Sequence, residues 1–166
     1  MTKEEIISKG IFIEDRFNVN YSEFKIELYL DFFRTNNEIL FSNLTSLDSE
    51  PQMTVLTEIV NELISFDKKN EEWIKDKSWE HFKICVKNTS YGMVDDDGFE
   101  NEKEANIAHF KIYNKEDSYN ALKLKLIMVD LDFTEFRYIN LIFKCPWDEE
   151  HGIWIGVKNG ILESVN

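Results

Sequence analysis

The sequence predicts a single α+β domain, in which an antiparallel sheet of N-terminal strands and a C-terminal strand meander carries a helical pair on one face. Three patterns predict it: residues 24–32 alternate apolar and polar side chains, residues 51–87 repeat apolar side chains at steps of three and four, and residues 122–165 alternate again. With 166 residues, 43% of them hydrophobic, and only 6 Gly and 2 Pro, the chain can bury a core.

The N-terminal strands are predicted at residues 11–13, 24–32 and 39–41. In FKIELYLDF the residues from Phe24 to Phe32 alternate between a core face and a polar face, as a half-buried strand does. The pair Asn36-Asn37 predicts the turn that leads into the third strand.

The helical pair is predicted to begin at LDSEPQ, where Ser49 and Gln52 have the spacing of a capping box and Pro51 falls in the first turn. The apolar stripe of this first helix comprises Met53, Leu56, Ile59, Val60, Leu63 and Ile64. A second helix over residues 71–87 places Ile74, Ser78, His81, Phe82 and Cys85 on one face.

The C-terminal meander is predicted from residue 122 onward. Leu122, Leu124, Leu126 and Met128 share one parity, and Val129, Leu131 and Phe133 share the other, so a bulge is expected between 128 and 129. Strands then follow over residues 139–145 and 153–157, and Asn159-Gly160 predicts a tight hairpin into the last strand.

The charge of the chain restricts its partners. Nineteen Lys and Arg against 32 Asp and Glu give a net charge of −13, which argues against duplex DNA and anionic lipid. Without a signal peptide or a membrane-spanning stretch, we expect a cytoplasmic protein whose Cys85 and Cys145 are reduced. Motifs for dinucleotide, nucleoside triphosphate, esterase and dithiol chemistry do not occur in the sequence.

The densest charge lies in residues 95–104, with six acids against Lys103. We expect Asp95, Asp96, Asp97 and Glu100 to contact a basic protein partner, because complementary fields raise association rates and fix orientation. The competing interpretation is that high negative charge merely keeps a soluble protein from self-association.

The segment CPWDEEHG, residues 145–152, has two interpretations. In extended geometry Glu149 and His151 point the same way, and with Asp148 and His109 they would suit a metal-assisted hydrolase. The structural interpretation is favoured because a catalytic zinc normally needs three protein ligands. It makes Trp147, Asp148, Glu150, His151 and Gly152 a structural motif, with no metal and no cofactor.

The residues Phe143-x-Cys145-x-Trp147-Asp148-x-Glu150-His151-Gly152 carry a resemblance. The pattern resembles the C-terminal signature of a family of uncharacterised bacterial domains, over about residues 51–160. Such domains look like small cytoplasmic α+β proteins, some of which occur among the immunity proteins of polymorphic toxin systems. The resemblance implies no catalytic residue, and Trp154 stands where the family usually has a second glycine.

Three functions are therefore expected as alternatives. The first is a non-enzymatic acidic binding domain with a basic protein partner, such as an immunity-type protein that neutralises a basic toxin. The second is a metal-assisted hydrolase that uses Asp148, Glu149 and His151. The third is a structural module that binds a sister subunit through aromatic side chains on an exposed sheet face.

Overall fold

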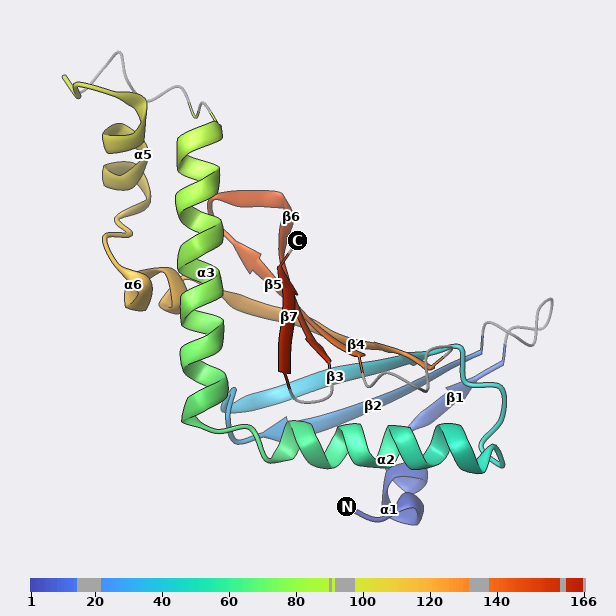
Figure 1. Ribbon diagram of the computed structural model, residues 1–166. Helices are drawn as coiled ribbons and strands as arrows, with labels where there is room; N and C mark the ends of the chain where they lie inside the picture. The colour runs from blue at the N-terminus through green and yellow to red at the C-terminus, as the bar shows by residue number, and fades with distance from the viewer. Residues whose placement is uncertain (15–21, 90, 92–97, 132–137, 159–160, 166) are drawn as a thin grey trace.

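The computed structural model describes residues 1–14, 22–89, 91, 98–131, 138–158 and 161–165 (Figure 1). Its helices are α1 (Lys3–Lys9), α2 (Glu50–Ile64), α3 (Lys68–Asn88), α5 (Glu102–Phe110) and α6 (Lys115–Asn120). Its strands are β1 (Ile11–Ile13), β2 (Glu23–Leu30), β3 (Thr35–Ser42), β4 (Lys123–Asp130), β5 (Tyr138–Cys145), β6 (Asp148–Lys158) and β7 (Ile161–Val165). The predicted α+β class is confirmed.

The seven strands form one sheet in sequence order, β1 to β7. All neighbours are antiparallel except β3 and β4, which run parallel with Ile39 beside Ile127. The sheet therefore consists of two antiparallel meanders joined by one parallel pair. Because parallel strands need a long crossover, all four helices from α2 to α6 lie in the connection between β3 and β4.

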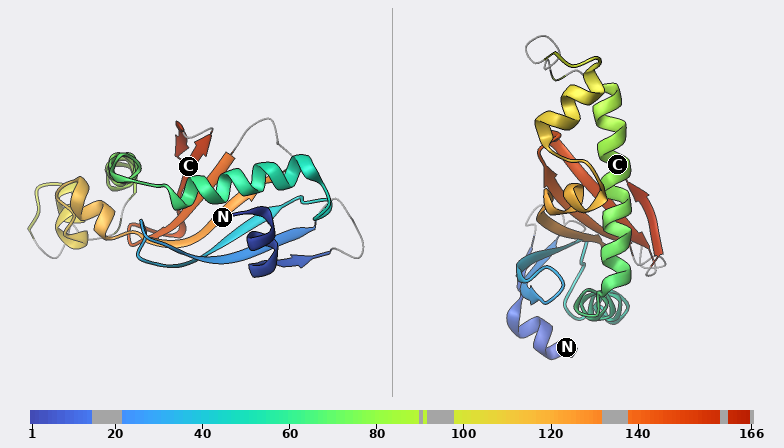
Figure 2. Two further views of the ribbon diagram at one scale, coloured as in Figure 1. Left: turned by 90° about the horizontal axis from the view of Figure 1, so that it is seen from below. Right: turned by 90° about the vertical axis from the view of Figure 1, so that its left-hand side faces the viewer.

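The helices cover one face of the sheet. Seen from below, α1 and α2 lie in front of the N-terminal strands, and α3 stands at a steep angle to α2 beside the C-terminal strands (Figures 1 and 2). The predicted stripe on α2 is buried at Met53, Leu56, Ile59, Val60 and Leu63, whereas Ile64 is 45% exposed. Together with the inward residues of the strands these side chains form the main core. The side chains of Phe82, Val86, Cys145 and Trp147 form a second, smaller cluster.

The helix starts differ from the prediction in one respect. Ser49 is the N-cap of α2 and Pro51 lies in its first turn, but the Ser49 side chain makes no capping hydrogen bond. Gln52 is buried and turns instead toward the preceding segment, where its amide donates to Asn43 O at 2.7 Å and accepts from Thr45 N at 2.9 Å. The predicted capping box is therefore wrong. The buried Gln52 side chain forms hydrogen bonds with the backbone of the preceding segment, and these stabilise the fold more than a capping bond to Ser49 would.

The turn between β2 and β3 lies earlier than predicted. Asn36 and Asn37 are paired inside the ladder, opposite Tyr29 and Leu28, and the turn comprises residues 31–34. Arg34 takes the left-handed conformation that closes it, with φ 52°. The prediction failed because a pair of asparagines is tolerated in a strand when one of them, Asn37, has its side-chain amide bonded to Thr35 O at 2.7 Å.

The bulge in β4 is real but is not between 128 and 129. The register shifts between Leu124 and Leu126, and from there Ile127 and Val129 are the buried residues. Leu126 and Met128 consequently lie on the opposite face of the sheet. Because both parities are apolar in residues 126–129, the pattern alone could not locate the switch.

Several elements were not predicted. Thr2 and Glu5 form a capping box that starts α1, and Asn101 and Asn114 cap α5 and α6. The connection between β5 and β6 is only Pro146 and Trp147, since Asp148 already pairs with Cys145. The expected hairpin residues Asn159 and Gly160 lie outside the described residues, although β6 and β7 pair as predicted. No helix in the described ranges has the length and apolarity to cross a membrane.

Candidate functional site

The face of the sheet that the helices leave uncovered carries a continuous row of side chains. Glu27 pairs with Glu38, Leu126 with Ile142, and Ile142 with Trp154. Glu38 lies beside Leu126, one residue before the paired Ile39 and Ile127. Glu27, Glu38, Ile142 and Trp154 point away from the core because the residues on both sides of each of them are buried. Leu126 lies on the same face because it pairs with Ile142 and precedes the buried Ile127. We call this set the open-face row.

A second row runs next to the first one and extends its apolar part. Leu40, Met128, Asn140 and Gly156 follow one another across strands β3 to β6. Leu40, Leu126 and Met128 are half-buried, and Trp154 remains 39% exposed. Strands are about 4.8 Å apart, so the open-face row, which crosses five of them, is roughly 19 Å long.

The acidic end of the row contains an uncompensated pair of carboxylates. Glu27 and Glu38 are both exposed and lie directly opposite each other on β2 and β3. In the part of the chain that the structure describes, no basic nitrogen lies within salt-bridge distance of either one, whereas Glu23 on the same strand has Lys25 at 3.8 Å. Like charges in this position destabilise a sheet, so the pair favours a cation brought by another molecule.

The residues best placed to bind a metal lie elsewhere, where α3 meets the β5–β6 turn. One ligand atom from each of His81, Cys85 and Asp148 lies within 4.8 Å of the others, and no other group of three such residues converges within the described ranges. The Cys85 Sγ atom is 3.7 Å from His81 Nδ1. The sequence places His81 and Cys85 on one helix face, but it does not indicate that Asp148 joins them.

The hydrogen bonds of this cluster favour a structural role. The Trp147 indole donates to His81 Nδ1 at 3.0 Å, so a neutral His81 carries its proton on Nε2 and has no free nitrogen lone pair for a metal. Burial lowers the pKa of His81, although the Asp148 carboxylate opposes this shift. Burial also raises the pKa of the Cys85 thiol, with a smaller contribution from Asp148. An imidazole whose lone pair already accepts a hydrogen bond is a poor base, and a protonated thiol is a poor nucleophile.

The predicted structural motif is partly assembled. Asp148 Oδ1 accepts from the backbone N–H of His151 at 3.1 Å and lies 3.2 Å from its Nδ1. Trp147 is 2% exposed and its carbonyl accepts from Tyr91 at 2.6 Å. Gly152 has φ 70°, and a Cβ there would lie 2.2 Å from the Phe143 carbonyl oxygen. Glu150 is exposed, 4.0 Å from His151 Nε2.

The β5–β6 turn does not bring the predicted hydrolase residues together. His151 is exposed, its side chain contacts Asp148 and Glu150, and neither Glu149 nor His109 joins them in the described part of the chain. His109 instead packs against Phe110 at the end of α5. The metal-assisted hydrolase stays a prediction, and the donor set it names is not preassembled.

The predicted acidic contact residues are only partly described. Asp95, Asp96 and Asp97 lie outside the described residues, and Glu100 is exposed just before α5. Two other acids of the same segment, Glu102 and Glu104, lie in the first turn of α5. There their negative charges interact favourably with the positive end of the helix dipole, so part of the charge of this segment stabilises α5.

The open-face row was missed by sequence reasoning, although a signal was present. The alternation in residues 24–32 does place Glu27 on the polar face, but Leu126 and Met128 were assigned to the core. A strand that is apolar at both parities, as residues 126–129 are, indicates that both of its faces are covered.

A family model described as "Domain of unknown function (DUF6985)" matches residues 12–166. No curated protein and no solved structure matches the chain. The match spans every strand of the sheet, the crossover helices, the open-face row and the β5–β6 turn. The chain therefore belongs to the DUF6985 family.

Proposed function

We propose that this chain is a non-enzymatic binding domain that docks a basic protein partner on the open face of its sheet, as an immunity-type protein covers a cationic toxin. The observation that carries the proposal is the open-face row. In it Glu27 and Glu38, which have no basic partner among the described residues, adjoin the apolar residues Leu126, Ile142 and Trp154. The net charge of −13 supports a cationic partner.

The carboxylate pair selects the partner by charge. Glu27 and Glu38 repel each other across the ladder, and the repulsion grows when a covering surface excludes water. An uncharged surface would therefore be rejected, whereas a lysine or arginine placed between the two carboxylates would turn repulsion into attraction. Penalties of this kind distinguish partners more than they add to affinity.

The apolar end of the row supplies the binding energy. Trp154 is 39% exposed beside the buried Ile142, and tryptophan is among the residue types most enriched at binding hot spots. The predicted contacts Asp95, Asp96, Asp97 and Glu100 belong to the same proposal as a second acidic surface. Their charges would steer the partner at long range.

The test compares two variants that lose the same charge. Glu27→Gln with Glu38→Gln removes two charges from the open face, and Asp95→Asn with Asp96→Asn removes two from the acidic segment. The wild-type protein is used to isolate a basic protein from lysate of the source cells. The purified partner is then measured by biolayer interferometry against wild type, both double variants and Trp154→Ala.

The open-face variant should slow association and flatten its salt dependence, because charges at the rim of an interface act mainly on the on-rate. Trp154→Ala should raise the off-rate by about 30-fold, the effect of losing a hot spot of about 2 kcal/mol. Equal, small effects from the two double variants would mean that only the overall field matters. A partner without excess positive charge, or one unaffected by Trp154→Ala, would refute docking on this face.

A further inference from the structure

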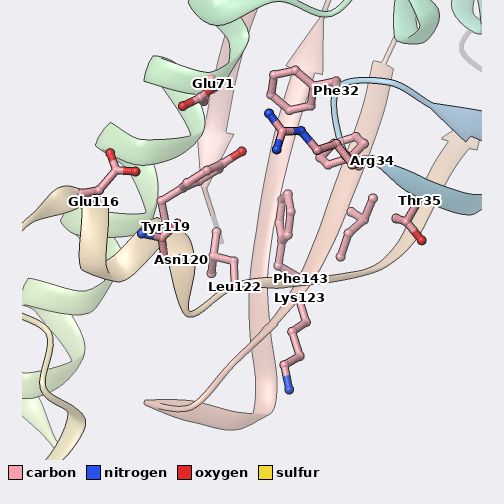
Figure 3. Close-up of a pocket in the computed structure, with 12 residues that line it drawn as sticks. Phe32, Arg34, Thr35, Glu71, Glu116, Tyr119, Asn120, Leu122, Lys123 and Phe143 are labelled. Atoms are coloured by element: carbon pink, nitrogen blue, oxygen red, sulfur yellow. The ribbon is translucent and has the colours of Figure 1, made fainter.

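A hollow of about 650 Å³ lies between the β2–β3 turn, helices α3 and α6, and the first residues of β4 (Figure 3). Its volume falls in the range of pockets that hold small organic molecules. The hollow lies on the core side of the sheet, because Phe143 and Leu124 on its wall pack with the main core. It is therefore separate from the open-face row.

Aromatic rings form the apolar wall of the hollow. Phe32 and Phe33 meet edge to face with their centroids 4.7 Å apart, and the ring of Phe33 lies 6.3 Å from that of Phe143. Leu122 and Leu124 are half-buried and continue the wall toward β4. Such a wall suits a flat or branched apolar group.

The two carboxylates on the acidic side of the hollow share one lysine. Glu71 and Glu116 face it from α3 and α6, and both bind Lys75, at 2.6 Å and 2.7 Å. These hydrogen bonds, first that of Glu116 and then that of Glu71, raise the pKa of Lys75, so its charge is retained. The Lys75 ammonium also lies 5.3 Å from the Tyr119 ring centroid. Lys75 therefore offsets the charge of these two carboxylates only in part.

Arg34 provides the uncompensated charge. Its guanidinium points into the hollow, next to Phe32 and toward the Tyr119 hydroxyl (Figure 3). Arg34 is exposed, and within the described ranges no carboxylate lies at salt-bridge distance from it, whereas Lys75 beside the hollow has acidic partners. Burial is the largest of the influences that raise the pKa of Tyr119, so its hydroxyl stays a neutral hydrogen-bonding group.

The backbone of Arg34 determines where its side chain starts. Arg34 has φ 52°, a conformation that glycine adopts most easily, and its N–H is held by Leu30 O at 2.9 Å. This left-handed residue closes the β2–β3 turn, and the turn accounts for its conformation. An arginine here, where a glycine would relieve the strain, holds a planar two-pronged donor at the mouth of an aromatic hollow.

We propose that this hollow binds a small organic carboxylate that has an aromatic or branched apolar body. The carboxylate would accept two hydrogen bonds from the Arg34 guanidinium, and the apolar body would lie against Phe33 and Phe143. The Tyr119 hydroxyl is placed to bond the carboxylate or a polar substituent.

The probe for the test is phenylacetate, with phenylacetamide as its uncharged match and phenethylamine as its cationic match. Binding is followed by changes in the ¹⁵N–¹H NMR spectrum, including the Arg34 side-chain Nε–H. A fragment of this size in a half-open pocket should bind with a Kd of about 1 mM. Phenylacetamide and phenethylamine should bind at least about tenfold more weakly, because they cannot accept a bidentate, charge-assisted pair of hydrogen bonds.

Two variants of equal charge separate recognition from folding. Arg34→Gly removes the guanidinium and relieves the backbone strain, so the protein should unfold at an equal or higher temperature and yet bind phenylacetate at least about tenfold more weakly. Lys9→Gln removes the same charge from the exposed end of α1, which does not line the hollow, and should change the Kd by less than about twofold, the effect of a screened charge.

Three results would overturn the proposal. One is binding of phenylacetamide as tight as that of phenylacetate, and another is undiminished binding to Arg34→Gly. The third is no spectral change in the wild-type protein at about ten times the expected Kd with either phenylacetate or the longer 4-phenylbutyrate. None of these results bears on the open-face row, so the two proposals fail separately.

Discussion

Gly152 should be hard to replace, and Gly98 provides a matched control. Both have left-handed backbones, with φ 70° at Gly152 and φ 72° at Gly98. A Cβ on Gly152 would lie 2.2 Å from the Phe143 carbonyl oxygen, whereas a Cβ on Gly98 would meet nothing within 4 Å. Substitution by alanine therefore tests strain alone at Gly98, and strain plus a backbone clash at Gly152.

The two free-energy costs follow from these contacts. Alanine in a left-handed conformation costs about 1 kcal/mol, which is the whole expected effect of Gly98→Ala. Gly152→Ala adds the cost of moving the β5 backbone at the bulge, about 1 to 3 kcal/mol for forced overpacking, so the total is about 2 to 4 kcal/mol. For a chain of this length each kcal/mol lowers the melting temperature by about 2 to 4 °C.

Urea denaturation followed by far-ultraviolet circular dichroism measures both costs. The m-values of the two variants should equal that of wild type, so that shifts in midpoint report free energies of unfolding directly. Gly152→Ala should lose at least about 1 kcal/mol more than Gly98→Ala. Equal losses would refute the close approach of β6 to the Phe143 carbonyl, and with it the structural interpretation of the β5–β6 turn.

Three further results are expected. Burial lowers the pKa of His81, so the folded state resists protonation of this side chain. The free energy of unfolding should therefore fall as the pH drops below about 6.5, the ordinary imidazole value. His81→Gln should flatten this pH dependence between pH 7.5 and pH 5, and an unchanged dependence would contradict the assignment. Burial raises the pKa of both thiols, that of Cys145 to about 12. Iodoacetamide at pH 8 should therefore label Cys85 of the native protein slowly and Cys145 more slowly still, and it should label both rapidly in urea, as measured by peptide mass spectrometry. Labelling of the native protein at the rate of the unfolded protein would disprove their burial. Finally, Glu38→Gln should raise the melting temperature of the free protein because it removes repulsion from Glu27, and the gain should shrink in about 1 M salt; a lower melting temperature would mean that the carboxylates do not repel.

Alternation and helical periodicity located most of the large elements. The inward residues of β2 and the stripe of α2 from Met53 to Leu63 were predicted correctly, because each segment has one apolar face and one polar face. The same rule could not place the bulge of β4, where Leu126 and Met128 are as apolar as Ile127 and Val129. A pattern with two apolar faces contains no information about which face is inside.

Short helices depend on local capping more than on periodicity, and three were missed for that reason. The helices α1, α5 and α6 bury few side chains: Ile6 in α1, Ala105 and Asn106 in α5, and Ser118 in α6. With so little apolar stripe, the only sequence signals were the caps at Thr2, Asn101 and Asn114.

The candidate sites could be predicted only in part, because each is made by strands or segments far apart in the sequence. Glu27 was predicted as a polar residue of its strand, but Glu38 fell between the predicted turn and the third strand predicted over residues 39–41. Its place opposite Glu27 follows from where the turn falls, and the turn was misplaced. The hollow at Arg34 combines residues of the β2–β3 turn with Tyr119 and Phe143, separated from the turn by the entire crossover. A local sequence pattern contains no information on which residues so far apart in the sequence come together in space.

The single parallel pair in the sheet bears on how the chain reaches its folded state. Each meander can form from neighbours in the sequence, but Ile39 meets Ile127 only after residues 43–122 have closed into a loop. Contacts so distant in sequence slow folding, because the entropy of closing the loop is lost before the contact is gained. The docking of the two meanders, once the crossover helices have collapsed on them, should therefore be the slow kinetic step, and β1–β3 and β4–β7 should gain protection from hydrogen exchange as two separate units.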